Sequence, residues 1–240
     1  MAFTAQDVKK LREMTNVGMM DCKKALQATD GDMDAAVDWL REKGLAKAAK
    51  KASRIAAEGV ALATVIDGIG VVIEVNAETD FASKTDAFQD LVKNLAIVVA
   101  KENPADVDAL KACTYPNSSL TVTEIMQEKV MSIGENMQIR RFARFAENTS
   151  VAYVHAGGSH GVLVNLAVEG DIDVTEVGKN VAMQIAAMGA KYWDKAMVPQ
   201  ADFDKEMAVQ ISIMDNDPKM ASKPAQVKEK IAAGKIAAYF

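Results

Sequence analysis

The carboxylates and histidines are the side chains through which this chain could do chemistry. Glu78, Asp80 and Asp86 lie close together after a predicted strand, where they could hold a magnesium ion or act as an acid and base pair. His155 and His160 flank a predicted turn, where they need no special role. No nucleophile or partner base is apparent, and the sequence contains no phosphate-binding loop, nucleophile elbow or HExxH pair. We therefore expect a protein without a chemical active site, and a hydrolase built on the three carboxylates is the alternative.

Composition excludes several other classes of protein. The net charge of −5 over 240 residues and a pI near 5.2 argue against a dedicated nucleic-acid binder. No apolar run is long enough to span a membrane, and the first residues do not resemble a secretory signal. Cys22 and Cys113 stand far apart, and two histidines are too few for a Cys and His zinc site. We expect a cytoplasmic protein with no metal and no cofactor of its own.

Residues 1–56 are predicted to form a small three-helix bundle with a connecting helix. Thr4 and Asp7 are spaced as a capping box for the first helix, and the second helix spans Met19–Ala28. The third helix is capped by Asp32 and ends at Gly44. Three helices in about forty residues give a core that is barely sufficient for a stable fold.

The segment from Leu45 to Ala57 is basic and has no acidic residue. It is predicted to be a solvated connecting helix, and the alternative is a basic face that meets an acidic partner. Its cations are Lys47, Lys50, Lys51 and Arg54.

Residues 57–147 and 148–240 are predicted to be two related α+β halves. Each begins with a hairpin and continues with a helix, and the two hairpins align at an offset that places Gly70 on Gly161. The predicted elements of the first half are strands Val60–Ile66 and Gly70–Val75, a helix from Thr85 or Asp86 to before Pro104, a helix Val122–Ser132 and a strand Asn136–Ala146. Those of the second half are strands Val151–His155 and Gly161–Ala167 and a helix Val174–Met188, with further helices after Pro199 and Pro224. The predicted fold class is α+β, with antiparallel sheets covered by helices.

Two positions could form binding surfaces. Met19 and Met20 are adjacent, so a helix cannot turn both toward one core, and one or both could be exposed; alternatively, both fill gaps in a thin core. Phe81 lies in a connection between a strand and a helix. It either folds back under the helix or protrudes as an aromatic wedge.

The sequence around these positions resembles the bacterial elongation factor Ts family. The run LREMTNVGMMDCKKAL, residues 11–26, is similar to one signature of that family, and EVNAETDFASKTDAF, residues 74–88, is similar to a second. Further matches are Ile133-Gly134-Glu135-Asn136 before a strand and Tyr153-x-His155 before the Gly161 strand. The matches follow the order of the family through most of the chain.

The resemblance implies an N-terminal module similar to ubiquitin-associated domains, followed by two related α+β halves. It also implies a nucleotide exchange factor for the GTPase elongation factor Tu. Two core halves in one chain make a one-to-one complex the simpler expectation. Thr79, Asp80 and Phe81 would press beside the magnesium site of that partner, and Ile133 and Gly134 would support the contact.

For the remaining contacts, the resemblance implies that Arg12, Met19 and Met20 dock the N-terminal module on a helix of the GTPase. His155 would contact another domain of the same partner.

The chain also departs from the family pattern. Thr15-Asn16-Val17-Gly18 replaces a more glycine-rich loop, and Ala82-Ser83 follows Phe81 where larger residues are usual. No long helical hairpin is evident in the second half, and the closing segment of the family would lie beyond Phe240. An adaptor that binds its partner through the Gly18-Met19-Met20 loop alone is a second alternative function.

Overall fold

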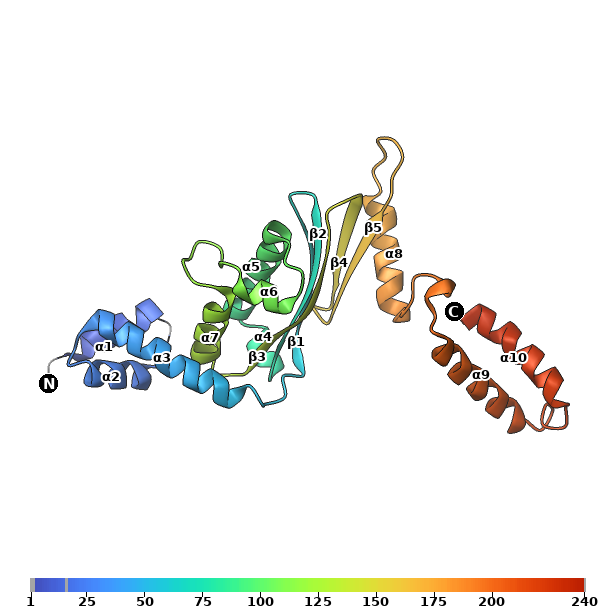
Figure 1. Cartoon of the computed structure of the whole chain (residues 1–240), viewed down its shortest axis with the longest axis horizontal. Helices are drawn as coiled ribbons and strands as arrows, with labels where there is room; N and C mark the ends of the chain where they lie inside the picture. The colour runs from blue at the N-terminus through green and yellow to red at the C-terminus, as the bar shows by residue number, and fades with distance from the viewer. Residues whose placement is uncertain (1–2, 16, 240) are drawn as a thin grey trace. The chain divides into compact units, whose positions relative to one another are not determined.

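The computed structural model describes residues 3–15 and 17–239 (Figure 1). The side chains of residues 45, 47, 48 and 237–239 are also outside the description, so Asn16 in the predicted break and the Lys47 side chain are not placed. The chain divides into two compact units, Met1–Ala187 and Met188–Phe240. The α+β fold class is confirmed. The boundaries predicted after residues 56 and 147 stay predictions.

The N-terminal helices are α1 (Ala5–Thr15), α2 (Met19–Ala28) and α3 (Met33–Lys51). The capping pair is present, since the backbone N–H of Thr4 donates to the Asp7 carboxylate at 2.7 Å and Asp7 N–H donates back to Thr4 Oγ1 at 3.3 Å. The bundle core consists of small and aliphatic side chains, namely Val8, Leu11, Val17, Cys22, Ala25, Leu26, Ala36 and Leu40.

The predicted end of the third helix at Gly44 is wrong, because α3 continues to Lys51. Gly44 is buried against α7 (Val122–Ile133), and a Cβ at this position would lie 3.1 Å from Met131 Sδ. Glycine here allows two helices to approach closely, and it does not act as a stop signal. The helix then ends earlier than the predicted connecting segment, which extended to Ala57.

The first sheet contains β1 (Glu58–Ile66), β2 (Ile69–Ala77) and β3 (Met137–Phe145) in the order β1-β2-β3, all antiparallel. Asp67 and Gly68 form the tight turn of its hairpin, both with positive φ. The helices of this half are α4 (Asp80–Ser83), α5 (Asp86–Glu102), α6 (Val107–Ala112) and α7 (Val122–Ile133). The sequence predicted α5 and α7 and missed the two short helices.

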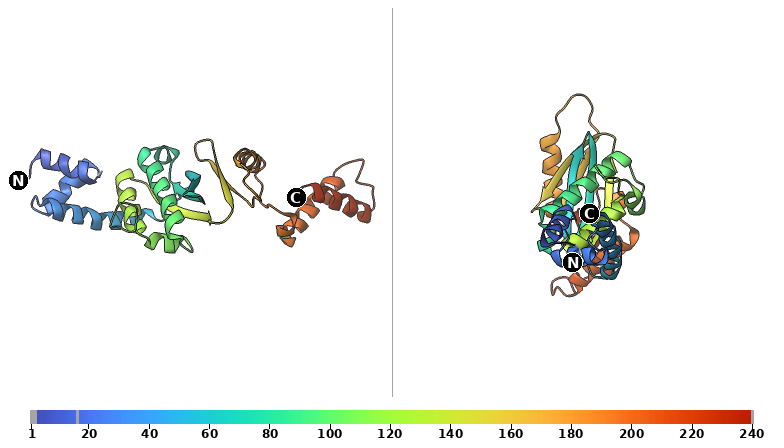
Figure 2. Two further views of the ribbon diagram at one scale, coloured as in Figure 1. Left: turned by 90° about the horizontal axis from the view of Figure 1, so that it is seen from above. Right: turned by 90° about the vertical axis from the view of Figure 1, so that its left-hand side faces the viewer.

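The second hairpin, β4 (Thr149–His155) and β5 (His160–Leu166), packs on the first sheet. Figures 1 and 2 show α5 on one side of the stacked sheets and α8 (Thr175–Met188) on the other. The sheets approach closely at two glycines that the repeat aligns. A Cβ at Gly70 would lie 2.3 Å from Ser150 Oγ, and one at Gly161 would lie 2.7 Å from the Ala61 carbonyl oxygen. The aligned positions therefore share a structural role.

The second unit consists of a short 3-10 helix η1 (Lys195–Met197) and the helices α9 (Gln200–Asp215) and α10 (Ala225–Tyr239), which pack against one another. The sequence predicted helices after Pro199 and Pro224, which is confirmed. The expectation of no helical hairpin is wrong, because α9 and α10 form one around Met214, Ala232 and Ile236. Within the described part of the chain, every helix is too short or too polar to span a bilayer.

Candidate functional site

Phe81 protrudes from a short helix that is otherwise packed against the first half. In α4, Ala82 and Ser83 are buried, whereas the Phe81 side chain is 81% exposed. Neighbouring residues of a helix point about 100° apart, so a helix that buries these two positions turns Phe81 outward. The alternative in which this ring folds back under its own helix is therefore wrong.

Asp80 lies next to Phe81 in the chain, and its carboxylate forms an ion pair with Lys84. Lys84 Nζ lies 2.6 Å from Asp80 Oδ2, one turn along the chain. The hydrogen bond from this ammonium lowers the pKa of Asp80 below its ordinary value, and the charge of Lys84 lowers it further. The tip of α4 therefore presents an apolar ring next to a negative charge that a partner could share.

Thr79 caps the N-terminus of α4 and links this helix to a distant segment of the chain. Its Oγ1 accepts the backbone N–H of Ala82 at 3.3 Å, which caps the helix. Glu135 accepts from both Thr79 N–H at 3.0 Å and Thr79 Oγ1 at 2.7 Å. In the opposite direction, the Glu78 carboxylate accepts a hydrogen bond from the backbone N–H of Asn136 at 2.6 Å.

These bonds bring two predicted contact regions together. Ile133 ends α7 and is half-buried, and Gly134 follows as an exposed cap with a φ of 90°. Because Glu135 comes directly after this turn, the turn lies beside the α4 tip. The sequence indicated both regions through the family signatures, but it did not indicate that Glu135 joins them. The only signal was the position of Glu135 inside one of those signatures.

The N-terminal contact residues lie on the surface of the bundle. Met19 and Met20 begin α2 and are 46% and 64% exposed, and Arg12 on α1 is also exposed. The bundle core is filled by other side chains. The alternative that both methionines fill that core is therefore wrong.

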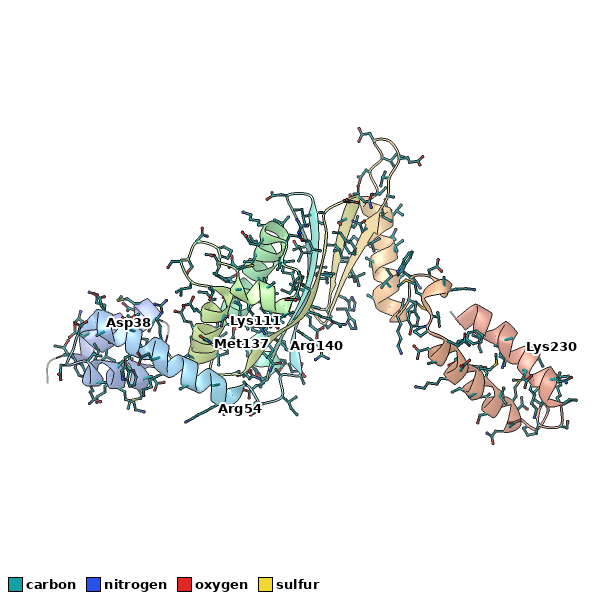
Figure 3. All side chains as sticks on the ribbon, viewed as in Figure 1. Asp38, Arg54, Lys111, Met137, Arg140 and Lys230 are labelled. Atoms are coloured by element: carbon teal, nitrogen blue, oxygen red, sulfur yellow. The ribbon has the colours of Figure 1, made fainter. Side chains whose placement is uncertain are left out.

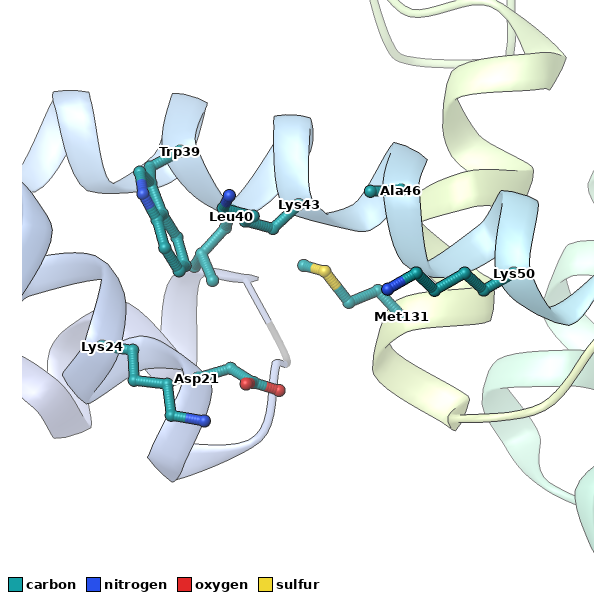
Figure 4. Close-up of a pocket in the computed structure, with 8 residues that line it drawn as sticks. All are labelled: Asp21, Lys24, Trp39, Leu40, Lys43, Ala46, Lys50 and Met131. Carbon is teal, nitrogen blue, oxygen red and sulfur yellow. The ribbon is translucent and has the colours of Figure 1, made fainter.

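The bundle is attached to α7, and the junction encloses a cavity of ≈ 300 Å³ (Figure 4). The floor of the cavity is apolar, and three lysines from α2 and α3 stand around it. The lining residues are Asp21, Lys24, Trp39, Leu40, Lys43, Ala46, Lys50 and Met131. Lys43 Nζ lies 5.4 Å from the centre of the Trp39 ring, a cation–π contact. Asp21 adds an acidic side chain to the lining, and sequence analysis did not indicate this cavity.

The basic segment after Gly44 is helical as far as Lys51 and most of its described residues are exposed, as predicted, while two of its cations contact the first half. Lys51 Nζ donates to the Gly134 carbonyl oxygen, and Arg54 Nη1 lies 3.4 Å from Glu78. The remaining predicted contact, His155, lies on another element. It is exposed at the end of β4, and Tyr153 Oη lies 2.8 Å from its Nδ1.

The three carboxylates first considered for catalysis are separated by their partners. Glu78 binds Asn136 and Arg54, Asp80 binds Lys84, and Asp86 is exposed in the first turn of α5. In the part of the chain that the structure describes, no group of three or more His, Cys, Asp or Glu residues could hold a metal ion. Phe81, Met19 and Met20 are instead exposed apolar side chains at the positions that the sequence predicted as contacts.

Comparison with known proteins gives a consistent family. The family model described as "Elongation factor TS" matches residues 78–240. The chain is 41% identical to elongation factor Ts of Magnetococcus marinus over 243 residues, which covers 100% of this chain and 79% of that protein. It is 43% identical to elongation factor Ts of Paramagnetospirillum magneticum, covering 99% of this chain and 77% of that protein. It is also 43% identical to elongation factor Ts of Clostridioides difficile, covering 98% and 77%.

Proposed function

Because the chain belongs to the elongation factor Ts family and is a translation elongation factor, we propose that it binds GDP-bound elongation factor Tu and promotes exchange of GDP for GTP. We place this exchange in the cytoplasm and in a one-to-one complex, with no direct part for nucleic acid. The protein acts by binding and not as an enzyme.

The exposed ring of Phe81 is the observation that carries this proposal. A large apolar side chain in water at 81% exposure contributes little to folding, yet it can bury most of its surface in a pocket of a partner. The wedge enters beside the magnesium and phosphate site of elongation factor Tu, with Asp80 next to it. Thr79, Ile133 and Gly134 support the same contact.

The mechanism is one of negative coupling between two ligands of the GTPase. Nucleotide is held by charge-assisted contacts to its phosphates and magnesium, and these contacts tolerate little displacement. A wedge that binds the displaced form must weaken nucleotide binding by the factor by which nucleotide weakens wedge binding. Each tenfold of coupling requires about 1.4 kcal/mol. One aromatic hot spot can contribute about 2 kcal/mol.

The second contact region supplies affinity. Arg12, Met19 and Met20 dock the bundle on a helix of the GTPase, since flexible thioether side chains adapt to an apolar surface. His155 makes a separate contact from the β4–β5 hairpin. In the adaptor alternative, the bundle alone recruits the partner and the α+β part is a passive scaffold. That alternative differs from the exchange factor in one result, because segment 1–55 alone would then bind as well as the full chain.

Release of labelled GDP from elongation factor Tu tests the proposal. We expect Phe81→Ala to slow stimulated release about thirtyfold, since a hot spot of about 2 kcal/mol is lost. Trp193→Ala is the matched control, because Trp193 is an aromatic residue with 85% exposure in the other unit. Equal release by Phe81→Ala and the wild type at unchanged stability contradicts the role of the wedge. No stimulation of release by the wild type contradicts the function itself.

A further inference from the structure

Glu78 and Glu135 hold two segments of the chain together by bonds that run in opposite directions. Glu78, at the end of β2, accepts the backbone N–H of Asn136 at 2.6 Å. Glu135, before β3, accepts the backbone N–H and the hydroxyl of Thr79 at 3.0 Å and 2.7 Å. We call these four residues, Glu78, Thr79, Glu135 and Asn136, the carboxylate clamp.

The clamp has the properties of a stiff connection. Its bonds are charge-assisted, and two of the three come from backbone N–H groups, which cannot rotate away as side chains do. All four residues are half-buried or buried, so water competes less for these bonds than at an open surface. The hydrogen bond from Asn136 also lowers the pKa of Glu78, which keeps this carboxylate charged.

A third segment meets the clamp where α3 ends. Asn136 Nδ2 donates to the Arg54 carbonyl oxygen at 2.8 Å, and Arg54 Nη1 lies 3.4 Å from Glu78. Figure 3 labels Arg54 after α3 and Met137 at the start of β3. The end of the N-terminal bundle, the base of α4 and the turn after α7 are therefore joined at one place.

The α4 helix needs such a connection because it cannot hold itself. It spans only Asp80–Ser83, far shorter than a helix that is stable alone. The exposed ring of Phe81 has little packing of its own to orient it. Thr79 Oγ1 caps α4 and also donates to Glu135, so the carboxylate of Glu135 sets where the helix begins. The direction of the ring thus depends on a residue 54 positions away, counted from Phe81 to Glu135.

We propose that Glu135, acting through Thr79 with the support of Glu78, is a positioning residue for exchange. This inference rests on the proposed function. A fixed wedge displaces the contacts of the nucleotide, whereas a wedge on a loose helix can still bind but spends part of its contact energy on becoming ordered. Loss of the clamp lowers the maximal rate of GDP release more than it lowers affinity for the GTPase.

The experiment measures GDP release from elongation factor Tu against the concentration of the factor, for the full chain. We expect Glu135→Ala to lower the maximal rate about tenfold, because the bonds to Thr79 are lost. Glu135→Gln retains one acceptor oxygen and should recover part of the rate. Glu147→Ala, which removes the same charge from the exposed turn between β3 and β4, is the matched control and should not change it.

A double variant separates positioning from general stability. If the clamp acts through the ring, Glu135→Ala has no further effect on the maximal rate in a Phe81→Ala background. Additive losses overturn the proposal, because the effect then does not pass through Phe81. Amide hydrogen exchange should also increase at residues 79–83 in Glu135→Ala alone.

A second pair guards against poor folding of the Glu135 variants. Thr79→Ala removes the hydroxyl that donates to Glu135 and should be slow, and Thr79→Ser, which keeps that hydroxyl, should be faster than Thr79→Ala. Wild-type maximal rates in both Glu135→Ala and Thr79→Ala overturn the clamp, while a slow Phe81→Ala in the same assay leaves the proposed function standing. If the wild type does not stimulate GDP release, in contrast, both the proposed function and the clamp proposal are contradicted.

Discussion

The two α+β halves share a pattern of elements but differ in how deeply they are packed. In the first half, α5 buries a continuous face that includes Phe88, Leu91 and Leu95. In the second, α8 buries Gly178 and Ala182 and leaves Val177 and Val181 exposed. The first half contains additional layers, because β3, α6 and α7 join its sheet and core, while β4 and β5 form a two-stranded sheet.

This difference bears on the proposed mechanism. A side chain proposed to push apart the contacts of a bound nucleotide needs a rigid support, and the first half offers one in its buried core and the carboxylate clamp. His155 lies on the less deeply packed half, so the contact proposed for it is expected to add affinity only.

The largest expected effect compares one aligned position in each half. When the two hairpin and helix segments are aligned, Leu95 and Ile185 hold equivalent positions to within one place. Leu95 is fully buried, whereas Ile185 is only half-buried. We expect Leu95→Ala to reduce the free energy of unfolding by about 2–5 kcal/mol, and Ile185→Ala by clearly less. Urea denaturation measures both. Equal losses would mean that the second half is as well packed as the first.

The aligned glycines at the sheet interface provide the next comparison. We expect Gly161→Ala to destabilise the protein by about 1–3 kcal/mol, because the new methyl group meets the Ala61 backbone. Gly70→Ala should cost a similar amount, because the new methyl group would lie 2.6 Å from Ser150 Cβ, which rotation of that side chain does not move. Thermal unfolding measures both variants. Wild-type stability in either variant contradicts the close approach of the sheets at that glycine.

Acidic pH should weaken the first half through Glu78. Its folded-state pKa is lowered, so its charged form stabilises the fold above the ordinary value of about 4.3. That stabilisation is lost as pH falls through the lowered pKa. Glu78→Gln should therefore melt below the wild type near pH 6, and the gap should close toward pH 3. Glu147→Gln, which removes the same charge from the exposed turn between β3 and β4, is the control and should melt like the wild type. A gap that persists at low pH contradicts this account.

The smallest expected effect concerns the exposed methionines. Changing Met19 and Met20 together to Ser should alter the free energy of unfolding by only about 0.5 kcal/mol, as for other surface changes. Affinity for elongation factor Tu, measured by calorimetry, should fall in the same variant. Early melting with unchanged affinity would show that these side chains support the core.

Local patterns were sufficient to predict most of the elements. Thr4 and Asp7, Thr85 and the Asp67-Gly68 turn make contacts within a few residues of the chain, so their spacing alone indicates helix starts and a hairpin. Hydrophobic periodicity likewise indicated the faces of α5 and α7.

Gly44, α4 and the second unit show where local reasoning failed. Glycine often ends a helix, but Gly44 packs against Met131 inside a longer helix. The four residues of α4 are too few for a periodic pattern, and the packing of α9 on α10 depends on contacts between separate helices.

By itself, the sequence determined the family and the α+β class, because both follow from local runs of side chains. Only the tertiary structure decided that Phe81 points outward and that Glu135 holds the base of its helix. The reason is physical. Exposure and orientation depend on which distant segments fill the space around a residue, and Glu135 reaches Thr79 only after α5, α6 and α7 have brought the chain back.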